Sequence, residues 1–141
     1  MTDPFYEKFI RRLIFQMNPE EAHELTIHGL GWHSRLKMAC RWLHRINART
    51  SCKSVRLFGL NFPNLVGLAA GLDKNAQCLP AFAAMGFGHA EVGTVTPKQQ
   101  PGNERPRLFR YPEKEAVINR MGFNNDGAEL MAKRIAKYMP R

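Results

Sequence analysis

An apolar run at residues 65–72, Leu-Val-Gly-Leu-Ala-Ala-Gly-Leu, constrains the fold more than any other feature of the chain. The run shows no alternation of polar and apolar residues, which is typical of a strand covered on both faces. A helix is expected over 76–85, with Pro80 in its first turn, and a second buried strand over 89–95. Strand, helix and strand within about thirty residues form a βαβ unit, which predicts a parallel strand pair with a right-handed crossover.

The first fifty residues are expected to be helical. Apolar side chains recur there at three- and four-residue steps, which predicts helices over 4–17, 19–30 and 35–46. Asn18 is expected to cap the second helix and Pro19 to occupy its first position, while Ser34 is expected to open the third. The glycines near residue 30 are expected to end the second helix.

The remaining segments predict hairpins at 55–64 and 108–119 and a last amphipathic helix over 125–137. A parallel sheet of only two strands would leave both edges open and most of its apolar faces uncovered. The pattern therefore predicts the front part of a larger α/β protein, because a complete barrel of that type needs about 250 residues.

Charge and cysteine content narrow the class of protein. The chain carries 21 basic and 12 acidic side chains, a net charge of +9, and the excess is spread over both halves. Such a balance suits nucleic acid, anionic lipid or an anionic small molecule. Scattered basic residues without a recognised motif argue against nucleic-acid binding. Three unpatterned cysteines predict neither a disulfide framework nor a zinc site, so a reducing cytoplasm is expected.

The end of the first predicted strand, residues 69–74, is the first candidate site. Its Ala and Gly residues allow a flat ligand or a phosphate-bearing cofactor to approach the backbone. Asp73 and Lys74 follow directly, at the edge where α/β proteins place their sites. A lysine there can hold a carboxylate or stabilise negative charge on a reduced ring. The alternative is a tight turn with a solvated ion pair.

Two further segments are candidates. Thr94 would end the second strand on the same rim as Lys74, although a threonine can equally serve packing. Three asparagines surround a glycine turn at 119–125, where their amides and Phe123 suit a small, planar, polar ligand. The alternative there is a loop in which Asn125 caps the last helix.

Six segments in order resemble the N-terminal part of the dihydroorotate dehydrogenase family, specifically its quinone-dependent, membrane-associated class. They are residues 67–74, 85–88, 91–97, 100–103, 105–110 and 118–125. The resemblance is loose before residue 55 and close after it. It implies an oxidoreductase, an FMN-containing (β/α)₈ barrel that oxidises dihydroorotate to orotate in pyrimidine synthesis and is reoxidised by a membrane quinone.

The same resemblance implies the roles of individual residues. Residues that would contact FMN are Ala70, Gly71, Leu72, Asp73, Lys74 and Thr94. Residues that would bind dihydroorotate or orotate are Lys74, Asn119, Arg120, Met121, Gly122 and Phe123. The catalytic base, a serine in this class, is expected beyond Arg141, and no metal is implied. We therefore expect the 141-residue chain alone to be inactive or to bind FMN very weakly.

The expected fold is α/β, an incomplete (β/α)₈ barrel of two βα units at residues 51–141, preceded by a helical, membrane-associated extension at residues 1–50. The basic amphipathic helices of the extension suit peripheral docking on the cytoplasmic face of the cell membrane, with an apolar groove for a quinone tail. A monomer is expected. Two alternatives stay open: a soluble helical cap with a solvated basic face, and a non-catalytic module that binds an anionic membrane surface.

Overall fold

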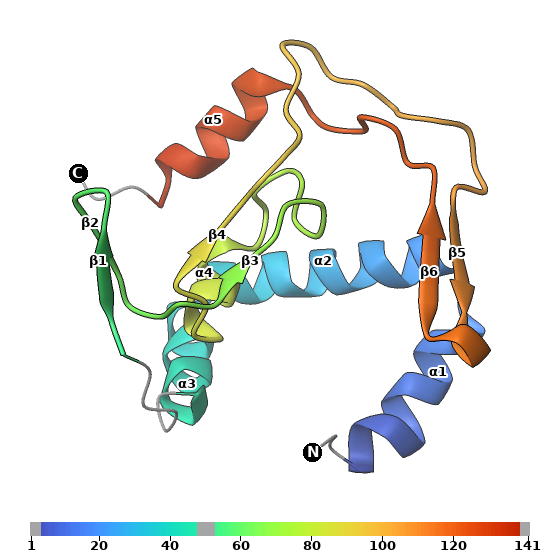
Figure 1. Cartoon of the computed structure of the whole chain (residues 1–141), viewed down its shortest axis with the longest axis horizontal. Helices are drawn as coiled ribbons and strands as arrows, with labels where there is room; N and C mark the ends of the chain where they lie inside the picture. Colours follow the sequence, from blue (N-terminus) through green and yellow to red (C-terminus); the bar gives the residue numbers. More distant parts are fainter. Residues whose placement is uncertain (1–3, 48–52, 139–141) are drawn as a thin grey trace.

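The N-terminal part of the molecule is helical. The computed structural model describes residues 4–47 and 53–138 (Figure 1). Its first helices are a π-helical turn η1 (Tyr6–Ile10), α1 (Arg11–Gln16), α2 (Pro19–Arg35) and α3 (Lys37–Asn47). The side-chain Oδ1 of Asn18 accepts a hydrogen bond from the Glu20 amide at 2.9 Å. The predicted cap and the predicted start of α2 at Pro19 are therefore confirmed.

The predicted end of this helix is wrong, because α2 continues through the glycines to Arg35. Glycine weakens a helix by only about 1 kcal/mol relative to alanine, and tertiary contacts readily outweigh that cost. Ser34 lies within α2, where its Oγ accepts a hydrogen bond from the Ala81 amide at 3.1 Å. Ile27, one turn before the glycines, is buried in the core. Contacts with the following part of the chain therefore stabilise the last turns of α2.

Three strand pairs follow. The strands are β1 (Val55–Leu57), β2 (Leu60–Phe62), β3 (Gly67–Leu68), β4 (His89–Ala90), β5 (Leu108–Tyr111) and β6 (Ala116–Asn119). Strands β1 and β2 form one antiparallel hairpin, and β5 and β6 form the other, with Leu108 opposite Asn119. Strands β3 and β4 pair in parallel, with α4 (Leu79–Ala84) between them in sequence, so the predicted order of strand, helix and parallel strand is confirmed.

The predicted length and burial of the parallel strands are wrong. Each has only two paired residues, because the first strand enters a turn after Leu68 and pairing cannot continue. Leu65 and Val66 are 67% and 61% exposed, so the first strand is not covered on both faces. Within the described residues the parallel sheet has two strands and no closed barrel.

The core is small and lies between α2 and α4. Ile27, Cys78 and Phe82 are buried there, and Leu68 packs against them from β3. Cys78 and the half-buried Cys40 are free thiols, whereas Cys52 lies outside the described residues. No described helix combines the length and the apolar character that crossing a bilayer requires. The last helix, α5, spans Ala128–Ala136, shorter than expected at both ends.

Candidate functional site

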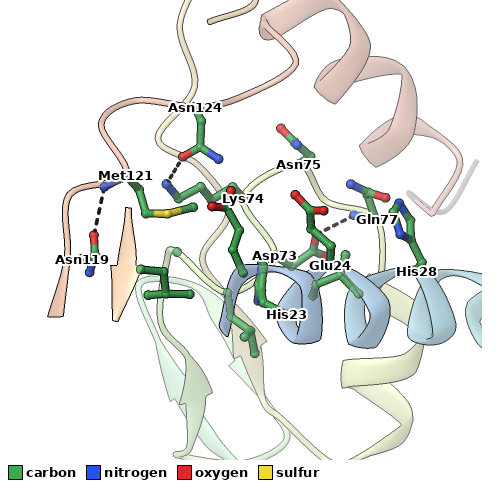
Figure 2. A pocket seen from close by; sticks show the side chains of 15 residues that line it. His23, Glu24, His28, Asp73, Lys74, Asn75, Gln77, Asn119, Met121 and Asn124 are labelled. Carbon is green, nitrogen blue, oxygen red and sulfur yellow. Dashed lines mark hydrogen bonds between the residues drawn. The ribbon is translucent and has the colours of Figure 1, made fainter. Parts of the chain in front are cut away.

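A hollow of about 630 Å³ lies between α2 and the segments that follow β3 and β6. Figure 2 shows the side chains around it. They are Glu20, His23, Glu24, Ile27, His28, Gly71, Leu72, Asp73, Lys74, Asn75, Gln77, Leu108, Asn119, Met121 and Asn124. The volume is within the range of about 300–1,000 Å³ that small-molecule sites occupy.

Lys74 projects into this hollow from the turn after β3. Its Nζ donates a hydrogen bond to Oδ1 of Asn124 at 2.5 Å (Figure 2). Its main-chain oxygen accepts a hydrogen bond from the Gly93 amide at 3.0 Å, so the ends of both parallel segments meet at this rim. Partial burial lowers the pKa of the Lys74 ammonium, the Arg107 guanidinium lowers it further, and the Glu20 carboxylate opposes both.

The buried carboxylate of Asp73 stabilises the turn between β3 and α4 through hydrogen bonds to the backbone. The carboxylate, 1% exposed, accepts hydrogen bonds from the amides of Gln77 and Cys78, both at 2.7 Å. These bonds satisfy donors that would otherwise be unpaired ahead of α4. The alternative of a solvated ion pair with Lys74 is therefore wrong, and the Asp73 carboxylate is occupied by the backbone.

The predicted site residues divide into two groups. Gly71, Leu72, Asp73, Lys74, Asn119 and Met121 border the hollow. Ala70, Thr94, Arg120, Gly122 and Phe123 do not. Thr94 is exposed. It directly follows Gly93, whose amide donates a hydrogen bond to the main-chain oxygen of Lys74. The guanidinium of Arg120 donates hydrogen bonds to the carbonyl of Pro106 at 3.2 and 3.0 Å, so it faces the neighbouring loop.

A buried ion pair lies beside the hollow, which one of its members, Glu20, borders. Oε1 of Glu20 accepts hydrogen bonds from Nε and Nη2 of Arg107 at 2.9 and 2.7 Å. The two side chains are 5% and 8% exposed. Burial disfavours the carboxylate, but the hydrogen bond and charge of Arg107, aided by Arg105, hold the pKa of Glu20 below its ordinary value. Sequence patterns did not reveal this pair, because 87 residues separate its members.

His23 also borders the hollow, although the sequence pattern assigned it no role there, and Asn124, one of the three predicted asparagines, borders it beside Lys74. Burial lowers the pKa of His23, the charge of Lys74 lowers it further, and nearby carboxylates, that of Glu24 foremost, oppose both effects. The available signal was helical spacing, because His23 lies four residues before Ile27, which is buried on the inward face of α2.

Asn125 does not cap the last helix, so that alternative is wrong. Helix α5 begins after Gly127, and Asn125 is 3% exposed in the loop before it. Its Oδ1 accepts hydrogen bonds from the amides of Thr96 and Gly127, at 3.2 and 2.9 Å, and its Nδ2 donates to Oγ1 of Thr96 at 3.0 Å. Asn125 therefore joins the loop after β4 to the loop after β6, and so helps to place Asn124 beside Lys74.

The arrangement defines an α/β protein with a hollow at the carboxyl ends of its parallel strands, the edge where such proteins place their sites. One lysine, Lys74, and four carboxamide side chains, those of Asn75, Gln77, Asn119 and Asn124, border the hollow. The sequence model of the family described as "Dihydroorotate dehydrogenase" matches residues 52–141. The chain belongs to the dihydroorotate dehydrogenase family.

Curated relatives and solved structures agree with this assignment. Dihydroorotate dehydrogenase (quinone) of Idiomarina loihiensis is 54% identical over 127 residues, which cover 89% of this chain and 36% of the relative. The protein of the same name from Chloroflexus aurantiacus is 50% identical over 143 residues, covering 96% and 39%. The crystal structure of DHODH from Eimeria tenella in complex with ferulenol superposes with a TM-score of 0.57 and 41% identity, over 73% of this chain and 30% of that one. The chain thus spans less than half the length of these relatives.

Proposed function

We propose that this chain supplies the substrate- and cofactor-binding edge of an enzyme that oxidises dihydroorotate to orotate in pyrimidine biosynthesis, with a quinone as electron acceptor. One observation carries the proposal: Lys74 and Asn119 border a single hollow at the strand ends of a chain in this family. Membership in a family whose relatives carry the name dihydroorotate dehydrogenase (quinone) supports the reaction and the acceptor.

The residues after β3 fit FMN, the cofactor that the family implies. Ala70 and Gly71 are exposed, and a Cβ placed at Gly71, where φ is +109°, would meet no atom within 4 Å. A planar ring can therefore approach the backbone closely. Ala70, Gly71, Leu72, Lys74 and Thr94 would hold the cofactor, and Asp73 would contribute only its main chain. The chemistry that FMN supplies when bound is acceptance of a hydride from the dihydropyrimidine ring.

Lys74 provides the positive charge of the site. Its half-buried ammonium faces fewer water molecules than an exposed one, so an anionic substrate carboxylate interacts with it strongly. Asn124 holds Nζ through its 2.5 Å hydrogen bond and thereby orients the charge before a ligand arrives. A preorganised donor of this kind stabilises negative charge that develops during a reaction by about 3 kcal/mol.

Asn119 provides a donor and an acceptor for the edge of a pyrimidine ring. Its Oδ1 accepts a long hydrogen bond, 3.4 Å, from the Met121 amide at the border of the hollow (Figure 2). Met121 adds an apolar surface beside it. We infer that Asn119 and Met121 contact the substrate ring, and that Arg120, Gly122 and Phe123 shape the loop that presents them.

We also propose that the helices before residue 50 dock peripherally on the cytoplasmic face of the cell membrane, where a quinone is reached. Apolar side chains on these helices are strongly exposed, including Phe9 at 59%, Leu13 at 66% and Trp42 at 64%. Basic residues such as Arg12 lie among them. Apolar and basic side chains together on one helix favour the interface of an anionic membrane. The same observation supports the second candidate, a membrane-binding module without catalysis.

Orotate binding distinguishes the two candidates. We expect added orotate to shift the side-chain amide NMR signals of Asn119 and Asn124, even where affinity is low. Lys74→Met should abolish these shifts because it removes the charge that holds the carboxylate. Lys98→Met, which removes an exposed charge outside the hollow, should leave them unchanged. Identical responses of the two variants, or no shift in the wild-type chain, would contradict the proposed site.

A further inference from the structure

A second cavity, of about 830 Å³, lies where α2, α3 and α5 meet the segment before α4. Its lining contains five basic side chains: Arg35, Lys37, Arg41, Arg134 and Lys137. None of the residues described around it is an aspartate or glutamate. The volume would accommodate a small ligand or a lipid headgroup. A cavity with this lining has an electrostatic preference for an anion.

Most of these charges are not neutralised by the protein. Arg134 pairs with Asp126, with 2.5 Å between Nη1 and Oδ2. The other four form no ion pair within residues 4–47 and 53–138. Lys37 and Arg41 are four residues apart on α3, so their like charges face each other and destabilise the helix. An anion bound between them would offset that repulsion.

The joint between α2 and α3 fixes the positions of these cations. Leu36 alone separates the helices; its amide donates to the carbonyl of His33, and its carbonyl accepts from the amide of Cys40, both at 3.0 Å. The chain bends between α2 and α3 (Figure 1). Arg35 is the last residue of α2 and Lys37 the first of α3, so they lie on either side of this hydrogen-bonded bend. The backbone needs no rearrangement to present both charges to the cavity.

An apolar stripe runs along α3 beside this cavity. Met38, Trp42 and Ile46 are spaced four residues apart and are 82%, 64% and 49% exposed. Trp32 lines the cavity itself and is 65% exposed. Tryptophan favours the level of the headgroups at a membrane surface. Basic side chains next to an exposed apolar stripe match a ligand that combines a phosphate with acyl chains.

We propose that this cavity binds the phosphate of an anionic phospholipid headgroup while Met38, Trp42 and Ile46 enter the membrane interface. This inference rests on the membrane-docking part of the proposed function and adds a defined headgroup site to it. The basic side chains recognise the phosphate, and the apolar stripe selects a lipid over a soluble phosphate.

The test compares two triple variants that lose the same net charge. Arg35→Gln/Lys37→Gln/Arg41→Gln empties the cavity of three cations, whereas the control, Arg56→Gln/Lys98→Gln/Lys114→Gln, changes exposed residues outside it. Binding is measured by co-sedimentation with phosphatidylcholine vesicles and with vesicles in which phosphatidylglycerol replaces part of the phosphatidylcholine. Each basic residue near an anionic surface contributes about a fivefold factor, so the cavity variant should bind the anionic vesicles roughly a hundredfold more weakly. The control should lose far less.

A soluble probe locates the binding. Monomeric short-chain phosphatidylglycerol should change the fluorescence of Trp32 in a chain that carries Trp42→Phe, and the cavity variant should not respond. Equal losses of vesicle binding in both triple variants would overturn the headgroup site while leaving membrane docking intact. A response of Trp32 to inorganic phosphate but not to the short-chain lipid would overturn the lipid as ligand. An orotate response without any vesicle binding would refute the membrane proposal and leave the substrate site standing.

Discussion

Replacing Glu20 with alanine probes the ion pair that joins α2 to the segment before β5. The carboxylate accepts two hydrogen bonds from Arg107, and both side chains are more than nine-tenths buried. Nη1 of Arg107 would keep its hydrogen bonds to the carbonyls of Pro101 and Asn103, at 2.7 and 2.8 Å. The substitution therefore leaves a buried guanidinium that is partly satisfied but has no counter-charge.

The magnitude follows from that geometry. Removing one partner of a buried pair costs about 3–5 kcal/mol, and the carbonyls that remain place this case near the lower end, about 3 kcal/mol. Arg105 also contacts Glu20 at 3.1 Å, but its side chain is 55% exposed, so its share is below about 1 kcal/mol. The free energy of unfolding of a small protein is about 5–15 kcal/mol, so Glu20→Ala should remove a large share of it.

Urea unfolding followed by the fluorescence of Trp32 and Trp42 measures this loss. The free energy of unfolding of a small protein falls by about 1–3 kcal/mol per molar urea, so the urea concentration at the unfolding midpoint should fall by roughly 1 M or more. Glu21→Ala is the matched control, because Glu21 is exposed in the same first turn of α2 and forms no ion pair within residues 4–47 and 53–138. It should cost less than about 1 kcal/mol. Equal losses in the two variants would refute the reasoning.

The same pair predicts a pH dependence. The pKa of Glu20 is lower in the folded chain than in the unfolded one, so its contribution is complete above the unfolded value. That contribution is lost as the pH falls through the lower, folded value. The stability difference between the wild-type chain and Glu20→Gln should therefore shrink in acid, below the ordinary range of glutamate. A difference that stays constant with pH would show that charge is not what Glu20 contributes.

Three further results are expected. Burial raises the pKa of the Cys78 thiol to about 12, so alkylation mapped by mass spectrometry should be much slower at Cys78 than at Cys40; equal rates would count against its burial. Asn18→Ala should lower the unfolding free energy by about 1 kcal/mol through loss of the cap, while Asn18→Asp should cost little; equal effects would exclude capping. Glu20→Ala should lower the pKa of Lys74, because the carboxylate raises it; an unchanged NMR titration would disprove that coupling.

Local sequence patterns predicted the elements whose stability is local. The hairpin at 108–119 has strands within the expected limits, and its ladder from Leu108–Asn119 to Tyr111–Ala116 needs no distant partner. Asn18 and Pro19 fixed the start of α2 through bonds within one turn. The end of α2 could not be predicted from local patterns. A hydrogen bond between Ser34 and Ala81, 47 residues apart in sequence, outweighs the weak destabilisation of the helix by glycine.

The candidate site divides in the same way. Lys74 and Asn119 were predictable because polar residues after strands meet at one edge of an α/β protein. The partner of Lys74 is Asn124, 50 residues away, and the choice between Asn119 and Asn124 depends on the path of a loop held by Asn125. Spacing along the chain does not encode such a choice. Three-dimensional packing decides it.

The hollow depends on residues from both predicted parts of the chain. Helix α2, which belongs to the N-terminal part, forms one wall, and the segments after β3 and β6 form the rest of the lining. Glu20 compensates the charge of Arg107 and opposes its effect on the pKa of Lys74. Without α2 in place, the Arg107 charge would act on Lys74 unopposed and the hollow would lack a side. Helix α2 therefore tunes the charge that Lys74 presents to the hollow.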